Sequence, residues 1–301
     1  MITNIRIFFL TLASLIIGAL ADFTGPHRLL AQASARPRAS APAIAPASRG
    51  GQKVAKPAAA RSAAKPAAGQ KVTKPTIILV HGAFADGTSW QRIIPVLERD
   101  GYVVIAVQNP LTAFAADVET TKRVIDAQRG PIVVVGHSYG GAVITKAAAG
   151  NSKVKSLVYI AAFAPEAGEK INAHNDKYPA MIGPALKPDA AGFLYIDRAQ
   201  FHYLFAQDVP TAEAGVMAAA QKPIIATAFE ATVEQAAWKN IPSWYLVAGA
   251  DRAMNPELQR FYAKRMNAKT TEMTTASHVP FISHPIEVAR LIEQAAGIQL
   301  K

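Results

Sequence analysis

Short runs of apolar, β-branched residues alternate with longer helical stretches from about residue 76 to the end of the chain. The apolar runs lie at 76–80, 102–107, 131–135, 154–160, 243–248 and, with more polar residues, 270–275. The helical stretches lie at 91–100, 115–129, 140–149, 256–266 and 285–296. Strands that are apolar on both faces and alternate with helices predict an α/β fold, with a mostly parallel central sheet flanked by helices.

The alternation is interrupted between about residues 165 and 240. This segment is rich in proline and aromatic residues, leaves the sheet after one predicted strand and returns at the next. We expect it to form a cap over the carboxyl ends of the strands, where parallel sheets bind ligands. Its aromatic side chains either line an apolar pocket or form the core of the cap, and the sequence leaves both readings open.

The first 75 residues differ from the rest in composition. Arg6 and the apolar stretch 7–21 are typical of a signal peptide, with cleavage after Ala21 or Ala33, so we assign 1–33 to a signal peptide region. We expect export to the periplasm or the medium; the alternative is anchoring by an uncleaved N-terminal helix. The Ala-, Pro- and Lys-rich segment 34–75 predicts a disordered basic tether, and 76–301 the folded domain.

The net charge of +11 belongs mainly to this N-terminal region. Residues 1–75 hold about eleven of the 32 Lys and Arg residues and one of the 21 acidic residues, Asp22. The folded domain is therefore nearly neutral, and we expect it to bind no nucleic acid. The tether either contacts anionic envelope surfaces or serves as a solvated spacer. The chain has no cysteine, which excludes disulfides, and nothing in it indicates an oligomeric state.

A glycine-rich motif follows the third apolar run directly. The sequence GHSYGG at 136–141 places Ser138 between Gly136 and Gly140, and a helix of small residues follows. Strand, tight turn and helix in this order are the context in which Gly-x-Ser-x-Gly forms a nucleophile elbow. Because the glycines permit close approach of the surrounding backbone, the turn can present the serine hydroxyl above the end of the sheet. We therefore predict that Ser138 is a nucleophile.

A serine nucleophile needs a base, and the base needs an acid that orients it. His278 follows the last predicted strand and Asp251 follows the strand at 243–248, so we expect both at the same end of the sheet as Ser138. The order Ser, Asp, His along the chain fits this architecture. His284 is an alternative base, Glu166 is the reserve acid, and an alternative role for Asp251 is to cap the following helix.

The loop after the first predicted strand supplies the remaining part of such a site. The backbone N–H groups of Ala83 and Tyr139 are predicted to form an oxyanion hole. His81 and His137 are interpreted as residues that brace the structure. No glycine-rich nucleotide motif and no spacing typical of metal ligands occurs in the sequence, so we expect neither a cofactor nor a metal.

These features resemble the α/β-hydrolase family over about residues 75–300, in particular a branch of small serine esterases related to plant methylesterases and hydroxynitrile lyases. The resemblance is carried by HGAF at 81–84 with Trp90, GHSYGG at 136–141, IPSW at 241–244 leading to Asp251 and Arg252, and Ser277-His278. It implies Ser138, His278 and Asp251 as a catalytic triad. Hydroxynitrile lyases typically carry a lysine after the catalytic histidine, where this chain has Val279, so the resemblance favours an esterase.

The predicted function is a cofactor-independent serine hydrolase. We expect it to cleave carboxylic esters of small to medium apolar substrates through an acyl-enzyme intermediate, with Phe84 and Phe163 in contact with the substrate. Hydrolysis of amides, lactones or carbon–carbon bonds is a neighbouring alternative. An alternative from another class is a ligand-binding protein on the same scaffold, with little or no turnover.

Overall fold

The computed structural model describes residues 74–297. The predicted signal peptide region 1–33 lies outside the described residues, and so does all but the last two residues of the predicted tether 34–75. Within residues 74–297, no helix is long and apolar enough to cross a membrane.

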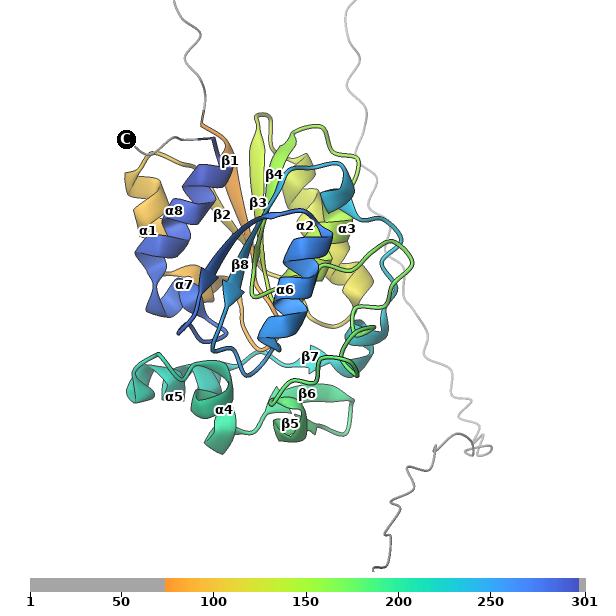
Figure 1. Ribbon diagram of the computed structural model, residues 1–301, viewed down its shortest axis with the longest axis vertical. Helices are drawn as coiled ribbons and strands as arrows, with labels where there is room; N and C mark the ends of the chain where they lie inside the picture. Colours follow the sequence, from red (N-terminus) through yellow and green to blue (C-terminus); the bar gives the residue numbers. More distant parts are fainter. Residues whose placement is uncertain (1–73, 298–301) are drawn as a thin grey trace, which may run out of the picture. The chain divides into compact units, whose positions relative to one another are not determined.

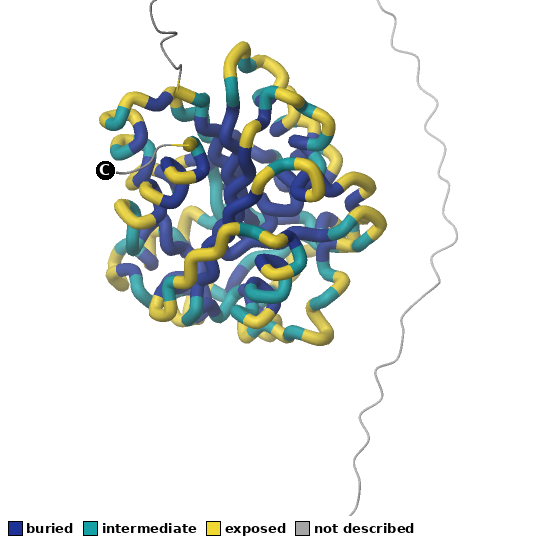
Figure 2. Tube along the Cα trace, turned by 45° about the horizontal axis from the view of Figure 1, so that its top comes forward, coloured by how far each residue is buried: buried dark blue, intermediate teal, exposed yellow. Residues whose placement is uncertain are grey.

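A six-stranded sheet forms the centre of the domain. Its strands are β1 (Thr76–Val80), β2 (Val104–Val107), β3 (Ile132–His137), β4 (Val154–Ile160), β8 (Ser243–Ala248) and β9 (Lys269–Met273). They lie in the order β2-β1-β3-β4-β8-β9, and each is parallel to its neighbours. The middle strands β1, β3, β4 and β8 are almost continuously buried, as expected for a sheet covered on both faces (Figure 2). The predicted α/β fold is confirmed.

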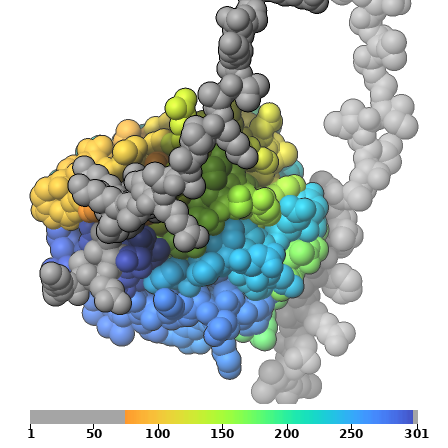
Figure 3. Space-filling view, turned by 90° about the horizontal axis from the view of Figure 1, so that it is seen from above, coloured from red at the N-terminus to blue at the C-terminus, as the bar shows by residue number. Residues whose placement is uncertain are grey.

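Helices cover both faces of this sheet. They are α1 (Ile94–Arg99), α2 (Phe114–Asp126), α3 (Tyr139–Ala147), α6 (Pro256–Arg265), α7 (Pro280–Ser283) and α8 (Pro285–Ala295). Figure 1 shows α1 and α8 on one side of the sheet and α2 and α3 on the other. Early segments in orange therefore lie beside late segments in blue at the end of the molecule seen in Figure 3.

The chain between β4 and β8 forms a separate group of elements. They are η2 (Gly183–Ala185), β5 (Leu186–Pro188), β6 (Phe193–Ile196), α4 (Arg198–Phe205), α5 (Thr211–Ala220), β7 (Ile224–Ile225), η3 (Ala226–Glu230) and η4 (Ala237–Lys239). The strands β5, β6 and β7 pair antiparallel in a small sheet of their own. Figure 1 places α4, α5 and this small sheet beyond the end of the central sheet at which β1 finishes. We call the segment between β4 and β8 the cap.

Two details differ from the sequence-based expectation. The helix predicted at 91–100 is the shorter α1, and an unpredicted 3-10 turn, η1 (Gly87–Trp90), which the Asp86 side chain caps, precedes it. The loop after the last strand contains an unpredicted short helix, α7, which begins at Pro280, a residue suited to the first position of a helix.

Close backbone packing surrounds the turn between β3 and α3. A Cβ atom added at Gly140 would lie 2.5 Å from the carbonyl oxygen of Val80, and one at Gly136 would lie 2.7 Å from the carbonyl oxygen of Gly140. Because these neighbours are backbone atoms, they cannot move aside as a flexible side chain would. The two glycines are therefore required by the contact between β1, β3 and α3.

We expect Gly140→Ala to lower the free energy of unfolding by at least about 1–3 kcal/mol, the usual cost of inserting an atom into a packed site. Gly215→Ala is the matched control, because Gly215 also lies in a helix but has open space around it. Its added methyl group should stabilise the protein by about 0.5–1 kcal/mol. Urea unfolding of both variants checks the expectation, and equal effects of the two substitutions would contradict it.

Candidate active site

Ser138 lies in a strained turn between the last residue of β3 and the first residue of α3. Its backbone φ of 51° and ψ of −124° fall in a region that non-glycine residues rarely adopt. The Ser138 N–H donates to the carbonyl of Ile160 (3.2 Å), and the Ser138 carbonyl accepts from the N–H of Phe163 (3.1 Å). The backbone on both sides of the serine is thus fixed by the end of β4 and the segment that follows it.

His278 and Asp251 form a buried hydrogen-bonded pair. Asp251 follows β8, His278 follows β9, and His278 Nδ1 donates to Asp251 Oδ2 at 2.6 Å. Because the carboxylate accepts from Nδ1–H, the neutral ring has an unprotonated Nε2 that can act as a base. Ser138 and His278 line the same cavity, which we call the Ser138 cavity. Among the described residues no hydrogen bond joins the two side chains; such a bond is often completed only when substrate is bound.

Three further donors hold the Asp251 carboxylate. Its Oδ1 accepts from the backbone N–H groups of Ala253 (2.8 Å) and Met254 (2.9 Å), and its Oδ2 accepts from Gln259 Nε2 (2.7 Å). Gln259 is itself buried, and its Oε1 accepts from the N–H of Ala248 at the end of β8. Sequence reasoning missed Gln259, because a single polar residue inside a largely polar helix gives no signal. Hydrogen bonds to both of its oxygens therefore fix the position of the Asp251 carboxylate.

Two consecutive cap residues hold the loops that carry the acid and the base. Gln207 Nε2 donates to the carbonyl of Ala250, next to Asp251 (2.7 Å). Asp208 Oδ2 accepts from the N–H of Ser277, next to His278 (2.8 Å), and from the hydroxyl of Ser283 (2.9 Å). We call Gln207 and Asp208 the cap clasp. The sequence did not predict these two residues either, because nothing in the cap sequence indicates what its polar residues bind.

His81 and His137 are buried and brace the loops around Ser138. His81 Nδ1 donates to the carbonyl of Gly82 (2.9 Å), and its Nε2 accepts from the N–H of Asn109 (3.0 Å). Burial lowers the pKa of His81 to about 4. His137 Nε2 donates to the carbonyl of His278 (2.8 Å), and burial holds the pKa of His137 well below its ordinary value. Both rings are therefore neutral near pH 7, and His137 supports the backbone of His278.

The predicted oxyanion donors lie beside Ser138. Tyr139 is the first residue of α3, so its N–H has no acceptor within the helix. Ala83 lines the Ser138 cavity, and the preceding Gly82 is so close that a Cβ there would lie 2.7 Å from the Cβ of Ser138. Within the part of the chain that the structure describes, neither N–H donates a hydrogen bond. Both are thus available to an oxygen bound at this point.

The alternative residues take other partners. Glu166 forms an ion pair with Lys239, and His284 Nε2 lies 3.8 Å from Asp208 Oδ2. Neither lines the Ser138 cavity. In residues 74–297 no cluster of three or more His, Asp or Glu side chains is arranged to hold a metal ion.

The Ser138 cavity has a volume of about 470 Å³, within the usual range for small-molecule sites. Both residues expected to contact substrate, Phe84 and Phe163, line it. The cap contributes Tyr178, Phe205 and Phe229, together with aliphatic side chains. These three aromatic residues line the pocket, whereas Phe201 is fully buried in the core. Both roles that the sequence left open for the aromatic residues of the cap therefore occur.

Known proteins share the sequence pattern and the fold of this chain. The model of the alpha/beta hydrolase family matches residues 77–291. The chain is 28% identical over 245 residues to the alpha/beta hydrolase nvfD of Aspergillus novofumigatus (74% of this chain, 97% of that protein). It is 30% identical over 176 residues to a carbendazim hydrolyzing esterase of Nocardioides sp. (54% and 65%). The crystal structure of polyneuridine aldehyde esterase superposes with a TM-score of 0.66 at 18% identity (74% and 99%).

We expect acid to destabilise the fold through His81. Because its pKa is about 4 in the folded protein and about 6.5 in the unfolded chain, the unfolded state binds the proton more readily. The stability that neutral His81 confers is complete above pH 6.5 and is lost as the pH falls toward 4. The loss between pH 7 and pH 5 amounts to about 2 kcal/mol.

Urea unfolding at pH 7 and pH 5 measures this loss. His81→Gln, which cannot titrate, should reduce the difference between the two pH values by that amount, whereas His202→Gln in the cap, where the histidine is partly exposed, serves as control. A difference unchanged by His81→Gln would show that other groups cause the acid sensitivity.

Proposed function

Because this chain belongs to the alpha/beta hydrolase family, we propose that it is a serine hydrolase that cleaves carboxylic esters of small to medium apolar substrates. The observation that carries the proposal is the joint arrangement of a strained serine, a buried histidine–aspartate pair and two free backbone N–H groups around one apolar cavity. The resemblance to a carbendazim hydrolyzing esterase supports the choice of esters.

In the first half of the reaction Ser138 Oγ attacks the ester carbonyl while His278 Nε2 takes the hydroxyl proton. The Asp251 carboxylate stabilises the imidazolium that forms, through its hydrogen bond to Nδ1. Because its other lone pairs accept from Gln259 and two backbone N–H groups, the carboxylate keeps its position as the charge on the ring changes. Donors fixed in advance need no reorganisation in the transition state.

The negative oxygen of the tetrahedral intermediate is held by the N–H groups of Ala83 and Tyr139. The position of Tyr139 at the start of α3 adds the positive end of the helix dipole. His278 then gives its proton to the departing alkoxide oxygen, which leaves an acyl group on Ser138. In the second half His278 takes a proton from water as its oxygen attacks the acyl carbonyl. The bond between the acyl carbon and Ser138 Oγ then breaks, His278 returns the proton to Oγ, and the carboxylic acid is released.

We expect Ser138→Ala to lower kcat/KM for short-chain aryl esters by roughly 10³-fold or more, with the fold intact. The wild-type protein should also be labelled by a fluorophosphonate at Ser138, which peptide mass spectrometry can locate. Ser152→Ala is the control, because Ser152 is an exposed serine outside the Ser138 cavity.

The two readouts separate the alternatives. A wild-type protein that is labelled at Ser138 but turns over no ester would favour a ligand-binding protein on this scaffold. Hydrolysis that survives Ser138→Ala unchanged would remove the serine mechanism altogether. Circular dichroism of the variant confirms that loss of turnover is not loss of structure.

A further inference from the structure

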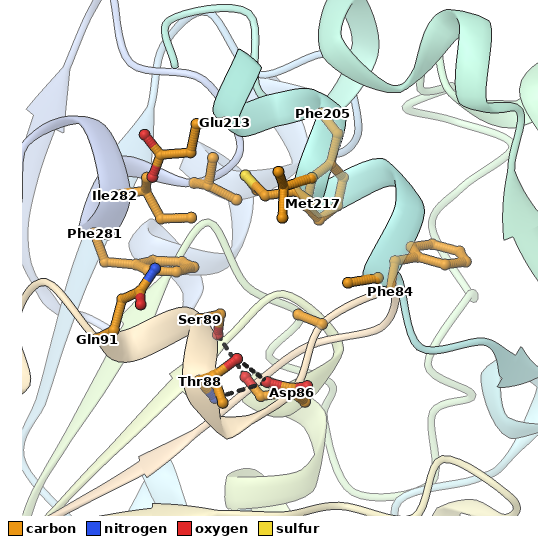
Figure 4. Close-up of a pocket in the computed structure, with 14 residues that line it drawn as sticks. Phe84, Asp86, Thr88, Ser89, Gln91, Phe205, Glu213, Met217, Phe281 and Ile282 are labelled. Carbon is orange, nitrogen blue, oxygen red and sulfur yellow. Dashed lines mark hydrogen bonds between the residues drawn. The ribbon is translucent and has the colours of Figure 1, made fainter. Parts of the chain in front are cut away.

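A second cavity lies next to the Ser138 cavity and shares two residues with it. Its volume is about 440 Å³, and it lies between the cap helix α5, the η1 segment and the short helix α7. We call it the α5 cavity. In Figure 4, Phe281 and Ile282 of α7 lie on one side of it and Phe84 on the other, with Met217 of α5 between them. Nothing in the proposed chemistry yet uses this cavity.

Two aromatic rings separate the α5 cavity from the Ser138 cavity. Phe84 and Phe205 line both cavities, and their rings meet edge to face with centroids 6.3 Å apart. The Phe205 ring also lies 4.9 Å from the ring of His278. An aromatic partition of this kind is formed by side chains alone, which can change rotamer when a ligand spans it.

Residues next to the proposed reacting groups in the sequence line the α5 cavity. His278 lines the Ser138 cavity and the next residue, Val279, lines the α5 cavity. Likewise Ala83 lines the Ser138 cavity, whereas Ala85 lines the α5 cavity. The two cavities thus meet along the segments that carry the base and one oxyanion donor.

Four of the five polar side chains in the wall of the α5 cavity already have partners, and the fifth, Gln91, is exposed. Asp86 Oδ1 accepts from the N–H (2.7 Å) and the hydroxyl (2.5 Å) of Thr88, and Ser89 Oγ donates to the Asp86 carbonyl, as Figure 4 shows. Glu213 is paired with Arg92 at 2.5 Å. A ligand would therefore meet mainly aromatic rings and aliphatic groups, so the cavity suits a neutral, largely apolar group.

We propose that the α5 cavity binds the apolar alcohol portion of the ester, while the acyl portion occupies the Ser138 cavity. This inference rests on the proposed esterase function. When the bond between the acyl carbon and the alkoxide oxygen breaks, the acyl group stays on Ser138 Oγ and the proton on His278 Nε2 moves to the leaving oxygen. The leaving group must therefore lie on the His278 side, where Val279 and Phe205 lead into the α5 cavity.

The same cavity gives the alcohol a route to solvent. Val216 lines it and is 68% exposed, so the cavity opens at the surface beside α5. The released alcohol can leave there while the acyl group is still attached to Ser138. The volume and lining of the α5 cavity favour aryl-alkyl or branched aliphatic alcohols over methanol.

The test measures kcat/KM of the full-length chain for methyl butyrate, benzyl butyrate and methyl hexanoate. Ala220→Trp places an indole ring at the wall of the α5 cavity. We expect it to lower the ratio of kcat/KM for benzyl butyrate to that for methyl butyrate at least about tenfold, because the benzyl group loses its space. The ratio for methyl hexanoate to methyl butyrate should stay constant.

Ala219→Trp is the matched control. Ala219 is the neighbouring exposed alanine of the same helix and lines neither cavity, so the same indole should leave both ratios unchanged. Met217→Ala enlarges the α5 cavity instead, and we expect it to raise the ratio for a still larger alcohol, 2-naphthylmethyl butyrate, relative to methyl butyrate.

Failure of this inference differs from failure of the esterase proposal. If the wild type hydrolyses methyl butyrate but Ala220→Trp leaves the benzyl ratio unchanged, or lowers the hexanoate ratio instead, the assignment of the α5 cavity is overturned and the esterase proposal stands. If the wild type hydrolyses none of the esters, both proposals are overturned.

Discussion

Ser138 keeps a left-handed backbone conformation because the chain around it packs backbone against backbone. This conformation costs a non-glycine residue roughly 1–3 kcal/mol and persists only where the surroundings enforce it. Here a Cβ added at Gly82 would lie 2.7 Å from the Cβ of Ser138, and one at Gly141 would lie 2.4 Å from the carbonyl oxygen of Phe163. The segments after β1, β3 and β4 are therefore locked together, and the rest of the site is placed relative to this junction.

Burial around the junction decides which groups carry charge. His81 and His137 are kept neutral, so they can donate and accept hydrogen bonds without placing a second positive charge beside His278. Asp251 accepts four hydrogen bonds, which offset the cost of burying its carboxylate. In the proposed mechanism, His278 therefore takes up a proton beside two histidine rings that stay neutral.

The parts predictable from sequence are those that depend on local pattern. The parallel strands follow from apolar runs, and Ser138, Asp251 and His278 were placed at one end of the sheet because each follows a strand. The structure brings the acid and base into contact and puts the serine on the same cavity. Gln259 and Asp208 could not be found in this way, because their partners are determined by how α6 and the cap pack.

The end of α4 joins substrate binding to catalytic geometry. Phe205, its last residue, forms part of the partition between the two cavities and contacts the ring of His278. Two residues later the cap clasp binds the loops of both Asp251 and His278. A shift of the backbone at the end of α4 would therefore reach the loops of Asp251 and His278 through Gln207 and Asp208, whereas a rotamer change of the Phe205 ring would not. Under the proposed function, the end of α4 thus links the residues that would contact the substrate to the loops that carry the acid and the base.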